Sequence, residues 1–280
     1  MSNWKVSAFA DEYADAFEEQ LTALREFGIG NIEIRHINGK NVSLLSGKEA
    51  LYAKRMLDDF SIKVSAIGSP IGKIKLDGDI EAHLDMARKV FELANILGTK
   101  YVRIFSFYAP DRKNIVDMKD QVFLLLERLV MSARAYNVTL CHENEANIYG
   151  NIPCRCKEMT NYFGGELKCV FDMGNFVLEG VDPYPEAYEL LKNDIAYFHI
   201  KDALARGAIV PAGKGEAKIR ETLLDHRAYA KEDFFVSLEP HLQTFSGLNA
   251  LVGRAFENPY QYADQRSAFA DAVTKFKELI

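Results

Sequence analysis

Short β-like segments recur along the whole chain, and each is followed by a segment with helical periodicity. The predicted strands lie at Lys5–Ala10, Asn31–Arg35, Lys63–Ile67, Tyr101–Phe105, Val138–His142, Lys168–Phe171, Ile195–Ile200 and Phe234–Leu238. The predicted helices lie at Asp15–Phe27, Lys48–Phe60, Ile80–Leu97, Lys119–Tyr136, Arg155–Phe163, Pro183–Lys192, Ile219–Ala230 and Pro259–Leu279. Eight such units, spaced by about 30 residues, predict an α/β fold in which residues 1–280 form a single (β/α)₈ barrel domain.

The main alternative is an open, doubly wound sheet. That fold usually carries a glycine-rich fingerprint after its first strand, whereas here the first predicted strand leads into SAFADEYAD. Neither GxGxxG nor GxxxxGK[ST] occurs at this place, and no linker rich in proline or serine divides the chain. The barrel is therefore the favoured interpretation.

The charge of the chain bears on its partners. There are 34 Lys and Arg against 40 Asp and Glu, a net charge of −6 without long blocks of one sign, so we expect neither nucleic-acid nor membrane binding. The opening MSNWKVSAFADEYAD lacks the features of a signal peptide, and no apolar stretch is long enough to cross a membrane, which favours the cytoplasm. The four cysteines, with their irregular spacing, are expected to be reduced structural thiols.

Residues that ligate metals collect at the ends of the last four predicted strands. Glu143, Asp172, His199 and Glu239 stand there, one on each strand. Because side chains alternate along a strand, each shares a face with the residue two positions earlier, and this face is expected to point toward the barrel axis. Catalytic groups of such barrels come from these carboxyl ends.

Three carboxylates that converge on one point repel each other unless a cation or a shared proton relieves them. A divalent metal ion supplies that relief, and a shell rich in carboxylates favours Mn²⁺, with Mg²⁺, Co²⁺ and Zn²⁺ as alternatives. A single carboxylate at a strand end is more often a helix N-cap or the partner of an arginine. Four ligand residues in register on consecutive strands favour a metal site instead.

Five motifs carry a resemblance to a known family: HENE at 142–145, DMGN at 172–175, FHIKD at 198–202, PAGKGE at 211–216 and SLEPHL at 237–242. Along essentially its whole length the chain resembles the sugar phosphate isomerase/epimerase family. These xylose isomerase-like barrels belong to the AP endonuclease 2 superfamily and include ketose 3-epimerases and inosose dehydratases. The resemblance implies that Glu143, Asp172, His199 and Glu239 bind one divalent metal ion.

The resemblance also implies a reaction on a small ketose or polyol. The metal makes a C–H bond next to a carbonyl acidic, and one carboxylate removes the proton while another returns it through an enediolate. The resemblance assigns those two roles to Glu143 and Glu239. The chain departs from many relatives in having Asn175 three residues after the metal-binding aspartate, and Ala205 followed by Arg206 where they have arginine six residues after the histidine.

Six residues are predicted to contact the substrate: Asn175, Lys201, Arg206, His241, Glu33 and Arg103. Glu33 and Arg103 have an alternative role as an ion pair inside the barrel.

His142 points away from the axis by alternation and is predicted to be a structural, hydrogen-bonded histidine. The glycines at 213 and 215 offer a weak phosphate-binding motif, for which a flexible loop is the alternative. In the tract at 241–262, Phe245 and Phe256 are candidate contacts of a lid or of a second subunit, so a homo-oligomer is one of the assemblies that the sequence allows.

Other function classes compete with the isomerase. A metal-dependent lyase, acting as a dehydratase on a keto-polyol or releasing the aglycone of a 3-keto glycoside, needs the same enediolate. An apurinic endonuclease shares the barrel but needs more histidine ligands than the six histidines here offer, and a basic face for DNA. A noncatalytic metal or sugar binder is the remaining alternative.

Overall fold

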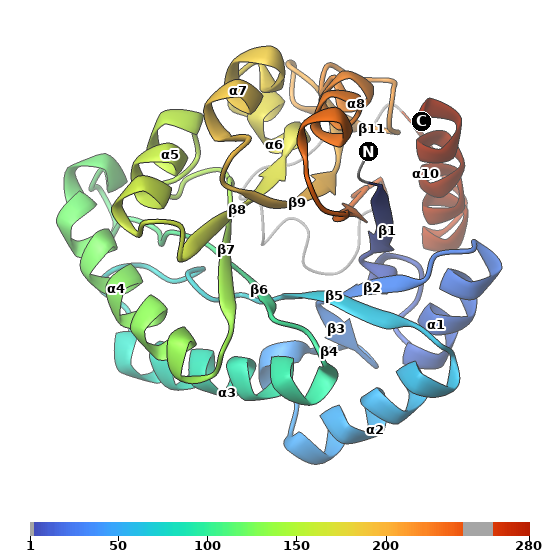
Figure 1. Cartoon of the computed structure of the whole chain (residues 1–280), viewed down its shortest axis with the longest axis horizontal. Helices are drawn as coiled ribbons and strands as arrows, with labels where there is room; N and C mark the ends of the chain where they lie inside the picture. Colours follow the sequence, from blue (N-terminus) through green and yellow to red (C-terminus); the bar gives the residue numbers. More distant parts are fainter. Residues whose placement is uncertain (1–2, 243–259) are drawn as a thin grey trace.

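The computed structural model describes residues 3–242 and 260–280, and eight parallel strands form its centre. These are β1 (Trp4–Ala8), β2 (Asn31–Ile34), β5 (Lys63–Gly68), β6 (Tyr101–Ile104), β7 (Thr139–Glu143), β8 (Leu167–Asp172), β9 (Ile195–Ile200) and β12 (Phe234–Leu238). Each corresponds to a predicted strand. Their order is β1-β12-β9-β8-β7-β6-β5-β2, and helices surround them (Figure 1). The protein is thus a (β/α)₈ barrel, as predicted.

The barrel is nearly closed. β1 and β2 stand at the two ends of the hydrogen-bonded order, and they lie next to each other. A side chain bridges them, because the Asn31 amide donates to the carbonyl oxygen of Val6 at 3.0 Å. The register between β2 and β5 shifts between Ile32 and Glu33, because Ser65 of β5 has no partner in β2.

The helices of the outer layer are α1 (Phe17–Glu26), α2 (Gly47–Asp59), α3 (Ile80–Leu97), α4 (Lys119–Ala135), α5 (Pro153–Tyr162), α7 (Tyr188–Leu191), α8 (Ile219–Tyr229) and α10 (Gln265–Leu279). Local signals fix several of their ends. Ser46 and Glu49 form a capping box at the start of α2, and Gly98, with φ of 84°, ends α3 in the left-handed conformation.

Three helical segments differ from the prediction. The segment predicted at 183–192 divides into a kinked turn at Pro183–Ala187, in which Tyr184 has extended φ and ψ angles, and the short α7. The last helix begins at Gln265 rather than at 259, which lies outside the described residues. A helix that was not predicted, α6 (Met173–Leu178), follows β8 directly and has Asp172 as its N-cap. Six residues are too few to show helical periodicity in the sequence.

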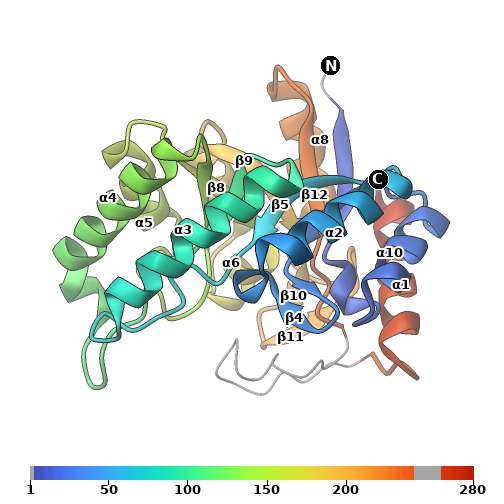
Figure 2. The ribbon, with the colours of Figure 1, turned by 90° about the horizontal axis from the view of Figure 1, so that it is seen from below.

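Two hairpins add to the carboxyl-terminal end of the barrel. β3 (His36–Ile37) pairs with β4 (Lys40–Asn41), and β10 (Asp202–Leu204) pairs with β11 (Ala208–Val210). Figure 2 shows both at the end of the barrel opposite the N-terminus. Short 3-10 turns lie at Ala10–Glu12, Val42–Leu44 and Ile115–Met118.

The apolar core has two layers. Most buried aliphatic and aromatic residues pack between the sheet and the helices, as alternation along the strands requires. A small separate cluster of Ala66, Cys141, Val170 and Tyr197 fills the barrel interior. Cys141, Val170 and Tyr197 each precede a residue of the predicted ligand set by two positions, so the predicted phase of β7, β8 and β9 is correct.

The remaining sequence-level expectations concern cysteines and membranes. The four cysteines are free thiols, and all but Cys154 are buried, as expected. Among the described residues, no helix is both long enough and apolar enough to cross a bilayer.

Candidate metal centre

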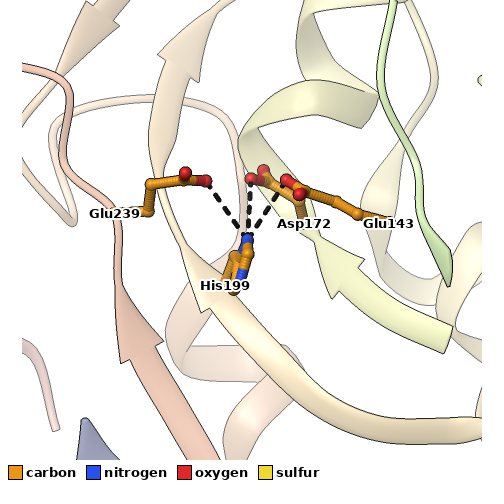
Figure 3. Close-up of side chains that lie close together, drawn as sticks. All are labelled: Glu143, Asp172, His199 and Glu239. Atoms are coloured by element: carbon orange, nitrogen blue, oxygen red, sulfur yellow. Dashed lines mark hydrogen bonds and ion pairs between the residues drawn. The ribbon is translucent and has the colours of Figure 1, made fainter. Parts of the chain in front are cut away.

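Four ligand-type side chains meet at the carboxyl end of the barrel. Glu143 ends β7, Asp172 ends β8, His199 lies in β9, and Glu239 follows β12. All four are buried, and one ligand atom from each lies within 4.8 Å of the others. His199 Nδ1 is 3.1 Å from Glu143 Oε1, 3.2 Å from Glu239 Oε2 and 4.0 Å from Asp172 Oδ2 (Figure 3). The structure therefore brings the whole predicted ligand set together.

Strand register explains this convergence. Asp172 is the parallel-strand partner of His199, and His199 is in turn the partner of Ser237. Glu239 is two residues beyond Ser237 and therefore on the same face of the sheet. Its backbone N–H continues the ladder by donating to the carbonyl oxygen of Ile200 at 3.2 Å.

The opposite side of the His199 ring is held by Glu33. Nε2 lies 3.1 Å from Glu33 Oε2, and the other oxygen of Glu33 accepts a hydrogen bond from the Tyr197 hydroxyl at 2.9 Å. A neutral imidazole that donates its Nε2–H to this carboxylate keeps the lone pair of Nδ1 directed at the three carboxylates. Histidines that ligate metals are usually oriented by such a carboxylate.

The donor set fits a hard divalent cation. Neighbouring ligands of an octahedral ion with bonds of about 2.1 Å are about 3 Å apart, which matches the spacing of His199 Nδ1 from the two glutamates. Three carboxylates and one imidazole suit Mg²⁺ or Mn²⁺, because neither ion needs thiolate ligands. Glu143, Asp172, His199 and Glu239 are thus the residues that would hold the ion.

Three side-chain cations also surround these carboxylates. Lys201 Nζ lies 2.9 Å from Asp172 Oδ2 and 3.2 Å from Glu239 Oε2. Arg103 Nη1 lies 3.1 Å from Glu143 Oε2, and Arg35 Nη1 lies 3.2 Å from Glu239 Oε1. Lysine and arginine therefore also relieve the repulsion between the crowded carboxylates, so their crowding alone does not require a metal ion.

Burial and charge shift the pKa values of the ligands in different directions. Burial raises the pKa of Asp172 to about 7, helped by the charges of Glu143 and Glu239 and opposed by Lys201. Burial acts the same way on Glu143, but His199 and Arg103 overcome it and lower the pKa of this carboxyl to about 2. For His199, the carboxylates outweigh burial and raise the pKa well above its ordinary value. A metal ion must therefore displace a proton from this cluster.

The DMGN motif builds one wall of the site through α6. Asp172 caps this helix, because its Oδ1 accepts the backbone N–H of Asn175 at 2.8 Å while Oδ2 faces Lys201. The Asn175 amide donates to Glu143 Oε1 at 3.3 Å, and its oxygen accepts from Lys201 at 3.2 Å. A Cβ on Gly174 would come within 2.8 Å of the Lys201 side chain, so glycine allows this close approach. Asn175 and Lys201, which were predicted to contact the substrate, thus line the site.

A second network fixes Glu239 from the side of β1 and β2. Arg35 makes a two-fold contact with Asp11, with Nε 2.7 Å from Oδ2 and Nη2 3.2 Å from Oδ1, and also reaches Glu12. Glu12 in turn accepts the backbone N–H of His241 at 2.8 Å, and His241 lies 3.6 Å from Glu239. His241, which was predicted to contact the substrate, therefore borders the cavity. Arg35, Asp11 and Glu12 were not predicted as part of the site.

Asp202 of the FHIKD motif organises the PAGKGE loop. Its carboxylate accepts backbone N–H groups from Ala203, Gly213, Gly215 and Ala217, at 2.8 to 3.0 Å. The two glycine amides that were considered for phosphate binding are therefore occupied within the protein. The loop is also tied down at several points, which does not fit the alternative of a flexible loop.

Other predicted site residues have mixed outcomes. Arg206 was predicted to contact substrate, but it lies exposed in the turn between β10 and β11 and does not border the cavity, because the hairpin carries it away from the barrel. Glu33 and Arg103 are not joined by an ion pair among the described residues, since each contacts the ligand set instead. His142 is buried, with Nε2 3.0 Å from Ser106 Oγ, as a structural histidine should be. Phe245 and Phe256 lie outside the described residues.

Sequence reasoning missed several residues that border the cavity. Its lining includes Arg35, Lys73 and Glu145 beside the predicted residues. Arg35 ends a predicted strand, and the charged end of a buried strand was a signal that could have found it. Lys73 stands in the loop after β5, where nothing in the sequence distinguishes it from a solvated lysine.

The chain belongs to the xylose isomerase-like TIM barrel family, whose sequence profile matches residues 21–251. No curated protein sequence matches it significantly.

Solved structures resemble the whole chain at low sequence identity. A D-psicose 3-epimerase from Clostridium cellulolyticum H10, solved with D-tagatose, has a TM-score of 0.75 at 12% identity, and 98% of each chain is covered. The probable 3-DHS dehydratase AsbF from Bacillus anthracis has a TM-score of 0.73 at 16% identity, again with 98% of each chain covered. A xylose isomerase-like barrel protein from Mycobacterium smegmatis, in complex with magnesium, has a TM-score of 0.69 at 15% identity over 100% of this chain and 97% of that one. At these identities the similarity establishes the fold.

Proposed function

We propose that the protein is a divalent-metal-dependent sugar isomerase or epimerase, which removes a proton from the carbon next to a carbonyl group of a small ketose or polyol derivative. The observation that carries the proposal is the convergence of four buried ligand atoms from Glu143, Asp172, His199 and Glu239 within 4.8 Å. A D-psicose 3-epimerase and a magnesium-containing protein among the structural neighbours support it. Mn²⁺ is the ion we favour, since the donors are mainly oxygen.

A metal ion held at these residues would polarise the carbonyl group and make the adjacent C–H bond acidic. The proton itself is moved by the chain's carboxylates. Glu143 directs Oε1 toward His199 and Oε2 toward Arg103, while Glu239 directs Oε2 toward His199 and Oε1 toward Arg35. Each glutamate thus has one oxygen toward the ligand cluster and one toward a guanidinium group. We assign proton removal and return to these two residues, which stand on β7 and after β12.

Neighbouring side chains orient the two bases and the substrate. Arg103 contacts both glutamates, with Nη1 3.1 Å from Glu143 Oε2 and 3.4 Å from Glu239 Oε1. Lys201 and Asn175 border the cavity with groups that can hydrogen-bond sugar hydroxyls. Burial of all these residues excludes water from the base and strengthens each interaction.

A lyase is the second candidate, because the probable dehydratase AsbF is among the structural neighbours. Loss of a β-leaving group follows the same proton removal, so the ligand set alone does not separate the two reactions. We also propose a cytoplasmic location and a small sugar or polyol as the partner. The net charge of −6 without long basic blocks supports neither nucleic acid nor membrane as a target.

The proposal is tested by incubating the protein and Mn²⁺ in D₂O with a panel of keto sugars and 3-keto glycosides. We expect deuterium to enter the sugar at a carbon next to the carbonyl group, in NMR spectra that also show either an inverted centre or a released aglycone. Glu239→Gln should abolish the exchange. Absence of exchange from every sugar, with Mn²⁺ bound, would contradict proton removal and leave a noncatalytic binder.

A further inference from the structure

We propose that Lys73 and Arg103 form an anion subsite beside the metal centre, and that the substrate carries a carboxylate or phosphate group away from its reacting carbon. This inference rests on the proposed function, because it specifies the substrate class for the same cavity. Both residues border that cavity, and both pack against the ring of Phe105. Lys73 Nζ is 4.2 Å and Arg103 Cζ is 4.9 Å from the ring centroid.

The loop that carries Lys73 is held firmly against the end of β6. Backbone hydrogen bonds run from Phe105 N to Ile71 O at 2.8 Å and from Phe107 N to Gly72 O at 3.1 Å. Gly72 has φ of 86°, and a Cβ there would lie 2.0 Å from the carbonyl oxygen of Phe105, so only glycine permits this contact. The backbone N–H of Gly72 also donates to His83 Nε2 at 2.8 Å. Lys73 therefore has a fixed place in the cavity wall.

Both cations keep hydrogen-bonding capacity that the described part of the chain does not use. The ammonium of Lys73 has no hydrogen-bond acceptor there; its ion pair with Glu145 Oε2 spans 3.5 Å, with both side chains 12% exposed. Arg103 is 5% exposed, and its ion pairs with Glu143 and Glu239 both use Nη1, so Nη2 has no acceptor within those residues. Buried donors are normally paired, so two such groups bordering one cavity indicate a ligand that accepts hydrogen bonds.

Arg35 is not part of the subsite, because all three nitrogens of its guanidinium group already contact carboxylates. Nε contacts Asp11, Nη2 contacts Glu12 and Nη1 contacts Glu239. Lys73 and Arg103 come from the β5–α3 loop and from β6, whereas the ligand set comes from β7, β8, β9 and the end of β12. Lys73 and Arg103 thus face the cavity from the first half of the barrel, whereas the carboxylates of the ligand set, together with Lys201, face it from the second half. A substrate with one anionic end and one polyhydroxy ketone end matches both sides.

An anionic group also suits the electrostatics of Lys73. Burial lowers the pKa of this lysine, and Glu145 only partly opposes the shift. A carboxylate or phosphate oxygen at hydrogen-bond distance would keep the ammonium charged and would replace the long contact to Glu145. Charge-assisted bonds of this kind are among the stronger ones in proteins.

The test uses the full chain loaded with Mn²⁺ and three sugars that differ only at carbon 6: D-fructose, D-fructuronate and D-fructose 6-phosphate. Titration calorimetry should show that at least one of the two anions binds more tightly than D-fructose by about tenfold or more. The better of the two anions identifies the carboxylate or phosphate group. Lys73→Met should remove most of this advantage. Lys75→Met changes an exposed lysine of the same loop and should keep it, and Glu145→Gln should increase it.

Equal binding of the three sugars, including no binding of any, would overturn the anion subsite. The subsite would also be overturned if Lys73→Met, with an unchanged melting temperature, still bound the anion more tightly than D-fructose by the same factor. Deuterium exchange into neutral sugars, together with either result, would leave the proposed reaction standing. If the wild-type protein showed no exchange but bound an anion in a way that depends on Lys73, the anion subsite would stand and the proposed reaction would be contradicted.

Discussion

Replacement of Glu33 by glutamine tests how the metal centre is oriented. The carboxylate is 1% exposed, lies 3.1 Å from His199 Nε2 and accepts the Tyr197 hydroxyl at 2.9 Å. Glutamine has nearly the same shape but lacks the negative charge and has only one accepting oxygen for these two donors. Loss of such a partner typically costs about 10- to 100-fold in metal affinity, or about 1.4 to 2.8 kcal/mol. We expect a loss of that size in Glu33→Gln.

The measurement is a titration of the metal-free protein with Mn²⁺, followed by electron paramagnetic resonance of the free ion. Tyr197→Phe is the matched control, because it removes the other hydrogen bond to Glu33 and leaves the contact with His199. Its effect on affinity should be smaller, and both variants should unfold cooperatively when free of metal. A dissociation constant of Glu33→Gln equal to that of the wild type would refute the role we assign to Glu33.

Three further perturbations follow from the same contacts. Lys201→Met removes an ammonium group that competes with the metal ion for oxygens of Asp172 and Glu239. Mn²⁺ should therefore bind more tightly to this variant, by about tenfold or more in calorimetry, and weaker binding would contradict this competition. Burial raises the pKa of Glu12 to about 8, so the folded state retains a proton that the unfolded state releases. In denaturant titrations, the free energy of unfolding should therefore fall as the pH rises from about 5 to about 8. The fall should be steeper than in Glu12→Gln by up to about 1.4 kcal/mol per pH unit. Parallel plots of unfolding free energy against pH for the two proteins would exclude this effect. Gly215→Ala would place a Cβ 2.2 Å from Asp202 Oδ1, so its melting temperature should fall clearly below that of Lys214→Ala in the same loop.

The strands could be predicted from the sequence because each is a short apolar run with β-branched residues, bounded by turn residues and followed by a longer periodic segment. The ligand set could be predicted because alternation within a strand and the common direction of parallel strands fix where its side chains point. Glu143 and His199 are examples, since each stands two residues beyond a small or aromatic residue of the barrel interior. These arguments need no knowledge of tertiary contacts.

What could not be predicted depends on contacts between distant segments. Lys73 reaches the cavity through a loop that backbone hydrogen bonds pin to the end of β6, and such a loop leaves no periodic signal in the sequence. Arg206 was misplaced because the residue count from His199 does not reveal the β10–β11 hairpin that carries it outward. The glycines of the PAGKGE loop were misread because their partner, Asp202, satisfies the amides that a phosphate would need.

Anomalous diffraction from crystals of the protein grown with Mn²⁺ would test the central claim most directly. We expect one strong peak within about 2.0 to 2.4 Å of oxygens from Glu143, Asp172 and Glu239 and of Nδ1 from His199. His199 Nε2 should remain hydrogen-bonded to Glu33. A map at saturating Mn²⁺ with no peak among these four side chains, and with Lys201 still paired to Asp172 and Glu239, would contradict a metal centre in this barrel.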